Sequence, residues 1–102
     1  MFLYTYLFLT GFNYTLKDLK NFRCIHSKAP GHPEYNVSLG IEATTGPLGQ
    51  GLGNAVGMAI AHKLFTNKIG GVFNHKSFII CFVGDGCLQE GISYEATTIA
   101  GL

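Results

Sequence analysis

Apolar residues gather at the start of the chain and recur at helical spacing behind it. Residues 2–10 form an almost uninterrupted apolar run, which predicts a buried helix ending at Gly11, a residue suited to a helix C-cap. In residues 15–25 the apolar side chains stand three positions apart, and Thr15 is a typical N-cap residue. This spacing predicts a second helix over residues 15–25.

A longer helical pattern covers residues 50–65, where apolar side chains recur every fourth position. Gly53, Gly57 and Ala61 form a parallel row of small residues. Such a row would let another backbone approach the predicted helix closely, and simple helix packing is its ordinary explanation.

The second half of the chain also contains a strand-like segment. Residues 77–83, SFIICFV, are continuously apolar, as in a strand buried on both faces of a parallel sheet. Residues 67–76 predict a turn before this strand, and a further helix is predicted to begin near Leu88. With the long irregular stretch over residues 26–49, this order predicts an α/β fold whose loops gather at the carboxyl end of a strand.

The composition limits the classes of protein that this chain can represent. Its 102 residues fit at most one small domain, and 47% hydrophobic with 13% charged residues argues against disorder. The net charge of +1, without a basic cluster, gives no footprint for nucleic acid. The apolar start has roughly ten residues against the roughly 20 that span a bilayer, and it lacks signal-peptide features, so no membrane partner is expected.

The cysteines and histidines form no recognisable metal motif. Cys24, Cys81 and Cys87 are odd in number and show no CxxC spacing, which favours reduced thiols over a disulfide framework or a zinc site. No HExxH or similar pair is present among the histidines. A cytoplasmic protein is therefore expected, with an organelle as the open alternative.

An acidic residue follows the predicted strand almost directly. Asp85 lies between Gly84 and Gly86, and glycine on both sides lets the backbone come near a bulky anion. An aspartate oxygen suits Mg²⁺ or Ca²⁺, and Mg²⁺ normally joins one or two protein oxygens to phosphate oxygens. This pattern predicts an Asp–metal–phosphate contact, while a tight turn with a surface aspartate is the structural alternative.

The glycine-rich stretch TTGPLGQGLGNAVG, residues 44–57, leads into the predicted helix. Such loops often hold phosphate through backbone N–H groups. Residues 51–57 also fit a GxGxxxG dinucleotide pattern, but no strand precedes them and no P-loop lysine is present. The loop is therefore expected to offer backbone groups and Leu48 to a flat ligand.

One histidine stands in a stiff loop. His32 lies in PGHPE, between two prolines. An imidazole there can hydrogen-bond a substrate oxygen or transfer a proton near pH 7. An incidental loop histidine is the structural alternative.

Taken in order, three stretches are more specific than any one of them. SKAPGHPE, GIEATTGPLGQGLGNAVGMAIA and VGDGCLQEGISYEA resemble transketolase, a thiamine-diphosphate enzyme family, and the resemblance covers essentially the whole chain. It implies that residues 1–102 are a fragment of the N-terminal diphosphate-binding domain of a longer enzyme. The implied fold is α/β, an incomplete doubly wound parallel sheet with flanking helices. Ala29 departs from the family, which often has Thr there.

The resemblance implies a cofactor site. Asp85 would ligate the divalent cation, Mg²⁺ or Ca²⁺, and the Gly86 amide would meet the diphosphate. Gly46, Pro47 and Leu48 would line the aminopyrimidine and thiazolium rings of thiamine diphosphate. A second metal ligand, an Asn, is expected beyond the chain, and a glutamate that activates the aminopyrimidine is expected on another domain of the partner subunit.

The resemblance also implies substrates and a partner. His32 would face the reacting carbon and the oxygens of the donor sugar phosphate. Glu90 and Glu95 match acidic positions of the family's homodimer interface, although an ordinary solvated helix also explains them. The implied reaction, in pentose phosphate metabolism, moves a two-carbon ketol unit from a ketose phosphate to an aldose phosphate, with the cofactor carrying the covalent chemistry.

Two alternatives remain open. A dihydroxyacetone synthase-like ketol transferase has similar loops, and acceptor-selecting residues outside the chain would separate it from transketolase. The chain could also be a non-catalytic folding or interaction module. On either view the 102 residues alone are expected to be inactive.

Overall fold

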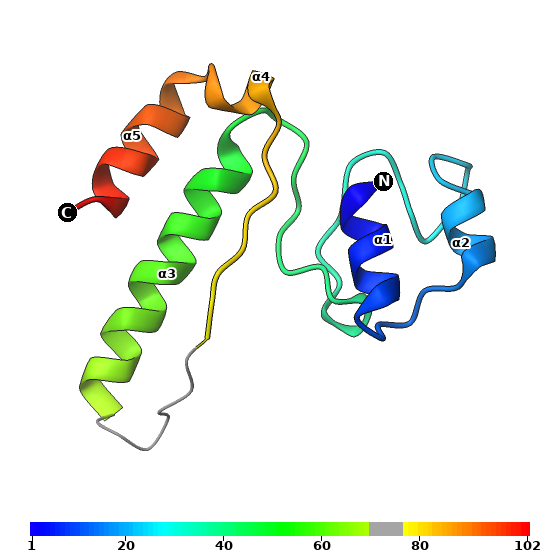
Figure 1. The fold of residues 1–102 in the computed structure, drawn as a ribbon, viewed down its shortest axis with the longest axis horizontal. Helices are drawn as coiled ribbons and strands as arrows, with labels where there is room; N and C mark the ends of the chain where they lie inside the picture. Colours follow the sequence, from blue (N-terminus) through cyan, green and yellow to red (C-terminus); the bar gives the residue numbers. More distant parts are fainter. Residues whose placement is uncertain (70–76) are drawn as a thin grey trace. The chain divides into compact units, whose positions relative to one another are not determined.

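The chain divides into two compact units in the computed structural model, which describes residues 1–69 and 77–102 (Figure 1). Unit 1 is Met1–Gly46 and unit 2 is Pro47–Leu102. The helices are α1 (Phe2–Leu9), α2 (Leu16–Lys20), the 3₁₀-helix η1 (Val37–Leu39), α3 (Gln50–Ile69), α4 (Asp85–Leu88) and α5 (Gly91–Ala100). Helix α1 packs on α2 within unit 1, and α3 packs on α5 within unit 2.

Helix α1 confirms the helix predicted over residues 2–10, but only one of its faces is buried. Tyr4 and Leu7 are buried, whereas Phe2 is 69% and Leu9 is 74% exposed. The prediction of a buried helix therefore holds for one face of α1 and not for the other. An all-round apolar sequence gives no sign of which face meets the core, so tertiary contacts decide it.

The end of α1 has the predicted glycine. Gly11 adopts a positive φ of 89°, and its N–H donates to the Phe8 carbonyl at 3.2 Å. The N–H of Phe12 donates to the Leu7 carbonyl at 3.0 Å. This pair of bonds is a Schellman motif, in which glycine tolerates the left-handed conformation that turns the chain out of the helix.

The start of α2 confirms Thr15 as the N-cap. The Thr15 N–H donates to Asp18 Oδ2 at 2.8 Å, and the Asp18 N–H donates to Thr15 Oγ1 at 3.2 Å. This reciprocal capping box satisfies two N–H groups at the helix start. The hydrogen bonds from Thr15 also hold the pKa of the Asp18 carboxyl below its usual value.

Helix α2 ends after Lys20, so the prediction of a helix over residues 15–25 is too long. Arg23 has a positive φ of 65°, and its N–H donates to the Ala29 carbonyl at 2.9 Å. This longer-range bond turns the backbone away from the helical path. The apolar spacing continues beyond Lys20 because some of these side chains still pack on the core.

The core of unit 1 is built on two tyrosines. The hydroxyl of Tyr4 donates to the Pro30 carbonyl at 2.6 Å, and that of Tyr14 donates to the Lys28 carbonyl at 3.3 Å. Their ring centroids are 5.7 Å apart. The other buried members are Leu7, Ala29 and Ile41. The core therefore fixes the backbone immediately ahead of His32.

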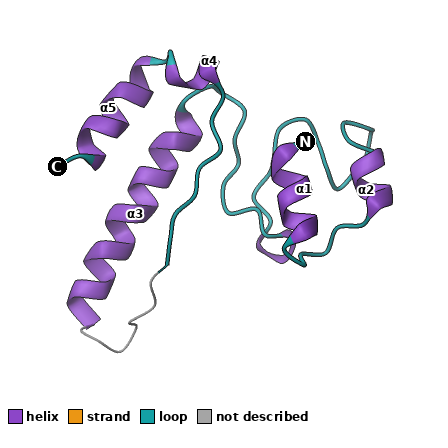
Figure 2. Ribbon diagram, viewed as in Figure 1, coloured by secondary structure: helices purple, strands orange, loops and turns teal. Residues whose placement is uncertain are grey.

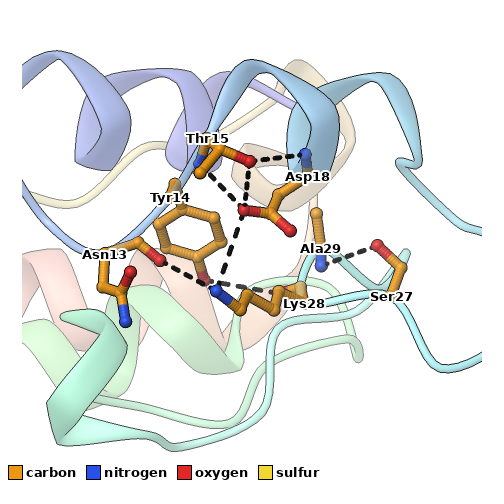
Figure 3. Close-up of polar contacts among 7 residues, drawn as sticks. All are labelled: Asn13, Tyr14, Thr15, Asp18, Ser27, Lys28 and Ala29. Carbon is orange, nitrogen blue, oxygen red and sulfur yellow. Dashed lines mark hydrogen bonds and ion pairs between the residues drawn. The ribbon is translucent and has the colours of Figure 1, made fainter.

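Polar contacts around Lys28 also hold the backbone ahead of His32 (Figure 3). The Lys28 ammonium lies 3.8 Å from Asp18 Oδ2 and donates to the Asn13 carbonyl at 3.5 Å. The Ala29 N–H donates to Ser27 Oγ at 3.0 Å. Because Lys28 is exposed, its ion pair adds little stability. The buried tyrosines contribute more to holding this part of the backbone.

The long loop predicted over residues 26–49 contains a small antiparallel pairing. Asn36 and Ile41 exchange two backbone hydrogen bonds of 2.9 Å around η1. Farther from this turn, the Thr45 N–H donates to the Pro33 carbonyl at 3.0 Å. The pairing therefore returns the chain from residue 45 to the neighbourhood of residue 33.

Unit 2 is helical where it is described. Helix α3 confirms the helix predicted over residues 50–65 and continues to Ile69. The helix predicted near Leu88 is divided into α4 and α5. Residues 70–76, which hold most of the predicted turn, lie outside the described residues.

A glycine ahead of α3 permits a close approach to α5. Gly49 has a positive φ of 81°, and a Cβ there would lie 2.7 Å from Ile92 Cγ2 and 2.9 Å from Ser93 Oγ. In the predicted small-residue row, a Cβ on Gly53 would lie 3.8 Å from Ile92, whereas one on Gly57 would meet nothing within 4 Å among the described residues. Among the described residues, the packing of α3 on α5 therefore involves Gly53, at the start of the row, and not Gly57.

The strand predicted over residues 77–83 is not formed within the described parts of the chain, where this segment is a loop (Figure 2). Phe78 is 82% and Ile80 is 64% exposed. A strand needs hydrogen bonds from a neighbouring strand, and the described residues supply none here, so the parallel sheet stays a prediction. No helix among the described residues has the length and apolar character needed to cross a membrane.

We predict that Tyr4→Phe lowers the free energy of unfolding of the chain by about 1–3 kcal/mol, because the Pro30 carbonyl would lose its partner in a partly buried position. Urea unfolding followed by circular dichroism measures this loss. Tyr14→Phe is the matched control and should cost less, because its bond is longer at 3.3 Å. A larger loss for Tyr14→Phe would contradict this ranking.

The same tyrosine predicts a loss of stability at high pH. Burial, with smaller contributions from Tyr14 and Glu34, raises the pKa of Tyr4 from 10.0 to about 12. The unfolded chain therefore releases this proton before the folded chain does, and stability falls between pH 10 and about 12. The fall should be shallower in Tyr4→Phe, and equal slopes in urea unfolding across this range would rule out the assignment.

Candidate functional site

The predicted site residues fall into two clusters, one in each unit. In unit 1 the structure brings His32 to Gly46. In unit 2 it brings Leu48 to the turn that contains Asp85 and Gly86.

His32 lies against the glycine-rich loop. A Cβ built on Gly46 would lie 3.3 Å from Cγ of His32, so the imidazole occupies the space that a side chain at residue 46 would need. The hydrogen bond between Thr45 and Pro33 holds the two segments together. His32 itself is exposed. An exposed imidazole that packs against the neighbouring backbone can hydrogen-bond a ligand or move a proton.

Arg23 supports the His32 loop and was missed by the sequence predictions. A Cβ on Gly31 would lie 3.2 Å from both Nε and Cζ of Arg23, so the guanidinium packs on the backbone next to His32. Arg23 and Gly31 are eight positions apart, and nothing in the sequence between them signals the contact. A positive φ at a non-glycine residue is the sign that the fold constrains Arg23.

Asp85 is the first residue of α4, with Gly84 as its N-cap. Its carboxylate is exposed and makes no hydrogen bond or ion pair with another described residue. No group of three or more His, Cys, Asp or Glu side chains in the described residues could hold a metal. An aspartate oxygen is a ligand of the kind that Mg²⁺ combines with phosphate oxygens.

The glycine-rich loop reaches the Asp85 turn within unit 2. A Cβ on Gly86 would lie 3.6 Å from Leu48 Cδ1. Leu48 is 52% exposed, and Pro47 is also exposed. A Cβ on Gly84 would meet nothing within 4 Å among the residues that the structure describes. An apolar side chain and a carboxylate without a partner among the described residues thus flank one turn. With a cation on Asp85, this turn fits a ligand that has an apolar part and an anionic part.

The two predicted interface glutamates both lie on α5 or at its start. Glu90 is the N-cap residue of α5, and Glu95 lies within the helix. Both are exposed, and neither forms an ion pair with another described residue. Their availability suits either a solvated helix or a partner surface.

Ser93 is a buried polar residue that the sequence predictions also missed. It is 2% exposed, and its Oγ donates a short hydrogen bond to the Cys87 carbonyl. In the sequence, Ser93 stands three positions before Ala96, which is also buried, and this helical spacing was the available signal.

All three cysteines are free. Burial is the main cause that raises the pKa of the Cys81 thiol, and the neighbouring Cys87 is the second.

Comparison with known proteins gives a match over the whole chain. Residues 1–102 match the family model described as transketolase, thiamine diphosphate binding domain. Transketolase 1 of Vibrio cholerae is 55% identical over 105 residues, and the transketolase of Dictyostelium discoideum is 52% identical over 105 residues. Each alignment covers 99% of this chain, which spans 16% of the length of either relative.

Solved transketolase structures resemble the chain as well. Transketolase from Leishmania mexicana has a TM-score of 0.77 and 46% identity, and a mutant transketolase from Pichia stipitis has a TM-score of 0.74 and 45% identity. Each covers 97% of this chain and 15% of the solved chain. These matches confirm the resemblance drawn from the sequence motifs. The chain belongs to the transketolase family, in the part that forms its thiamine diphosphate binding domain.

Proposed function

We propose that the chain is part of a longer enzyme that transfers a two-carbon ketol unit from a ketose phosphate to an aldose phosphate, in pentose phosphate metabolism. Membership of the transketolase family over residues 1–102 supports this reaction class. The observation that carries the site assignment is the approach of Leu48 to Gly86, 3.6 Å from a Cβ position on the glycine. This approach joins the glycine-rich loop to the turn whose Asp85 carboxylate has no partner among the described residues.

In this proposal thiamine diphosphate and a divalent cation, Mg²⁺ or Ca²⁺, are the cofactors. Asp85 would hold the cation, and the Gly86 amide would donate to the diphosphate. Gly46, Pro47 and Leu48 would line the cofactor rings through backbone and apolar contacts. When bound, the cofactor supplies the nucleophilic carbon that the side chains of this family lack.

His32 would act on the sugar. Its imidazole, held against Gly46, would donate to or accept from an oxygen of the donor ketose phosphate. A ring that already packs against Gly46 loses less freedom when the substrate binds than an unsupported ring does, which favours the transition state. This packing supports the assignment of His32 as the catalytic residue of the chain.

The remaining features extend the proposal to the whole protein. Residues 1–102 would be a fragment of the N-terminal diphosphate-binding domain, and residues 77–83 would join a parallel sheet with strands from outside the chain. Glu90 and Glu95 would face the second subunit of a homodimer and take part in a network linking two active sites. We also propose that the enzyme acts on sugar phosphates in the cytoplasm, as its free cysteines suggest, with an organelle as the alternative.

We predict that Asp85→Asn in the full-length protein weakens thiamine diphosphate binding most strongly when the cation is scarce. The amide is a poorer ligand than the carboxylate, so the bridge to the diphosphate loosens. Binding is titrated by protein fluorescence at several Mg²⁺ concentrations. Glu42→Gln, at another exposed carboxylate, is the control. Equal cofactor affinity of Asp85→Asn and the unmodified protein across the series would remove Asp85 from the metal site.

For His32→Ala in the full-length protein, we expect near-normal cofactor binding and a loss in ketose phosphate kinetics. Turnover should fall by roughly a hundredfold or more, because a proton-transfer or charge-stabilising group is removed. His32→Asn keeps a hydrogen-bond donor and should recover part of the binding of the donor sugar. Steady-state kinetics with varied donor measures both effects.

His62→Ala, on α3, is the matched histidine control and should leave these kinetics unchanged. If His32→Ala instead lowers cofactor affinity and leaves the donor kinetics normal, His32 belongs to the cofactor site and the assignment fails.

The 102-residue chain alone should show no ketol transfer. The proposed mechanism needs a second metal ligand and a glutamate that lie outside residues 1–102. The assay uses purified chain from a transketolase-deficient host, with ketose phosphate, aldose phosphate, thiamine diphosphate and Mg²⁺, beside the full-length protein. Measurable turnover by the chain would contradict the proposal.

A further inference from the structure

Ser93 makes a hydrogen bond between two helices. Its Oγ, on α5, donates to the carbonyl of Cys87 on α4, six residues earlier. A serine inside a helix more often bonds to the carbonyl three or four residues earlier in the same helix. The Ser93 hydroxyl therefore joins α5 to the short helix that begins with Asp85.

The same residue also touches the glycine-rich loop. A Cβ on Gly49 would lie 2.9 Å from Ser93 Oγ and 3.0 Å from the Cβ of Glu90. The Ser93 N–H donates to the Glu90 carbonyl at 3.0 Å. Ser93 thus contacts the Asp85 helix on one side and the residue after Leu48 on the other.

Helix α4 depends on such outside contacts. It spans only Asp85–Leu88, and so short a helix is unstable by itself. The Ser93 hydroxyl is buried, and burying a hydroxyl without a partner costs free energy. The bond to Cys87 satisfies this hydroxyl and fixes the carbonyl of the third residue of α4.

We propose that Ser93 is a positioning residue for the metal-binding turn. Through the Cys87 carbonyl it would keep the turn with Asp85 and Gly86 beside Leu48, where the residues could hold the cation and diphosphate. This inference rests on the proposed function of Asp85. Because Ser93 is buried, it would act on the affinity for the cation and cofactor through the turn rather than by touching either of them.

The test is Ser93→Ala in the full-length protein, with protein fluorescence reporting thiamine diphosphate binding during a Mg²⁺ titration. The Mg²⁺ concentration for half-maximal binding should rise about tenfold, as for other residues that orient metal ligands. Ser93→Thr keeps the hydroxyl and should restore most of the affinity. Ser38→Ala, at an exposed serine whose hydroxyl donates to Asn36, should change nothing.

Thermal melts separate positioning from general stability. A lower melting temperature with an unchanged Mg²⁺ requirement at a temperature where the variant is folded would overturn the inference. If Ser93→Ala does not fold, Ser93→Cys takes its place, because a thiol is a weaker donor. An intermediate rise in the Mg²⁺ requirement is then expected, and no rise would overturn the inference.

Asp85→Asn, measured in parallel, separates this inference from the proposed function. If Asp85→Asn raises the Mg²⁺ requirement and Ser93→Ala does not, only the role of Ser93 is wrong. If Asp85→Asn itself has no effect, the metal site fails and the role of Ser93 fails with it.

Discussion

The close approach at Gly49 is the constraint on which the candidate site of unit 2 depends. A Cβ there would lie 2.7 Å from Ile92 Cγ2, 2.9 Å from Ser93 Oγ and 3.0 Å from Glu90 Cβ, and the backbone φ is positive. The close contacts and the positive φ therefore both disfavour a side chain at residue 49. Because the loop can lie directly on α5, Leu48 reaches the turn that contains Asp85.

Unit 1 holds its candidate residue in a similar way. The buried Tyr4 hydroxyl fixes the Pro30 carbonyl, and the pairing of Thr45 with Pro33 brings the following loop back to His32. In each unit an exposed polar residue is thus held by buried contacts made elsewhere in the sequence. Such support lowers the cost of ordering the site when a ligand binds.

The sequence predicted those features that local chemistry decides. Thr15 and Gly11 mark helix ends because capping needs only nearby backbone groups. The length of α2 was not predictable, since Arg23 bonds to a carbonyl six residues later. Residues 77–83 have strand composition, yet pairing requires a second strand. Ser93 was missed because its burial follows from packing rather than from residue type.

The close approach at Gly49 would maintain the proposed cofactor site. The most direct test compares Gly49→Ala with Gly57→Ala in the full-length protein, measuring thiamine diphosphate affinity at saturating Mg²⁺ with both variants shown to be folded. A Cβ on Gly57 meets nothing within 4 Å among the described residues. The account predicts a large loss of affinity for Gly49→Ala and unmodified affinity for Gly57→Ala; equal affinities in the two variants would contradict it.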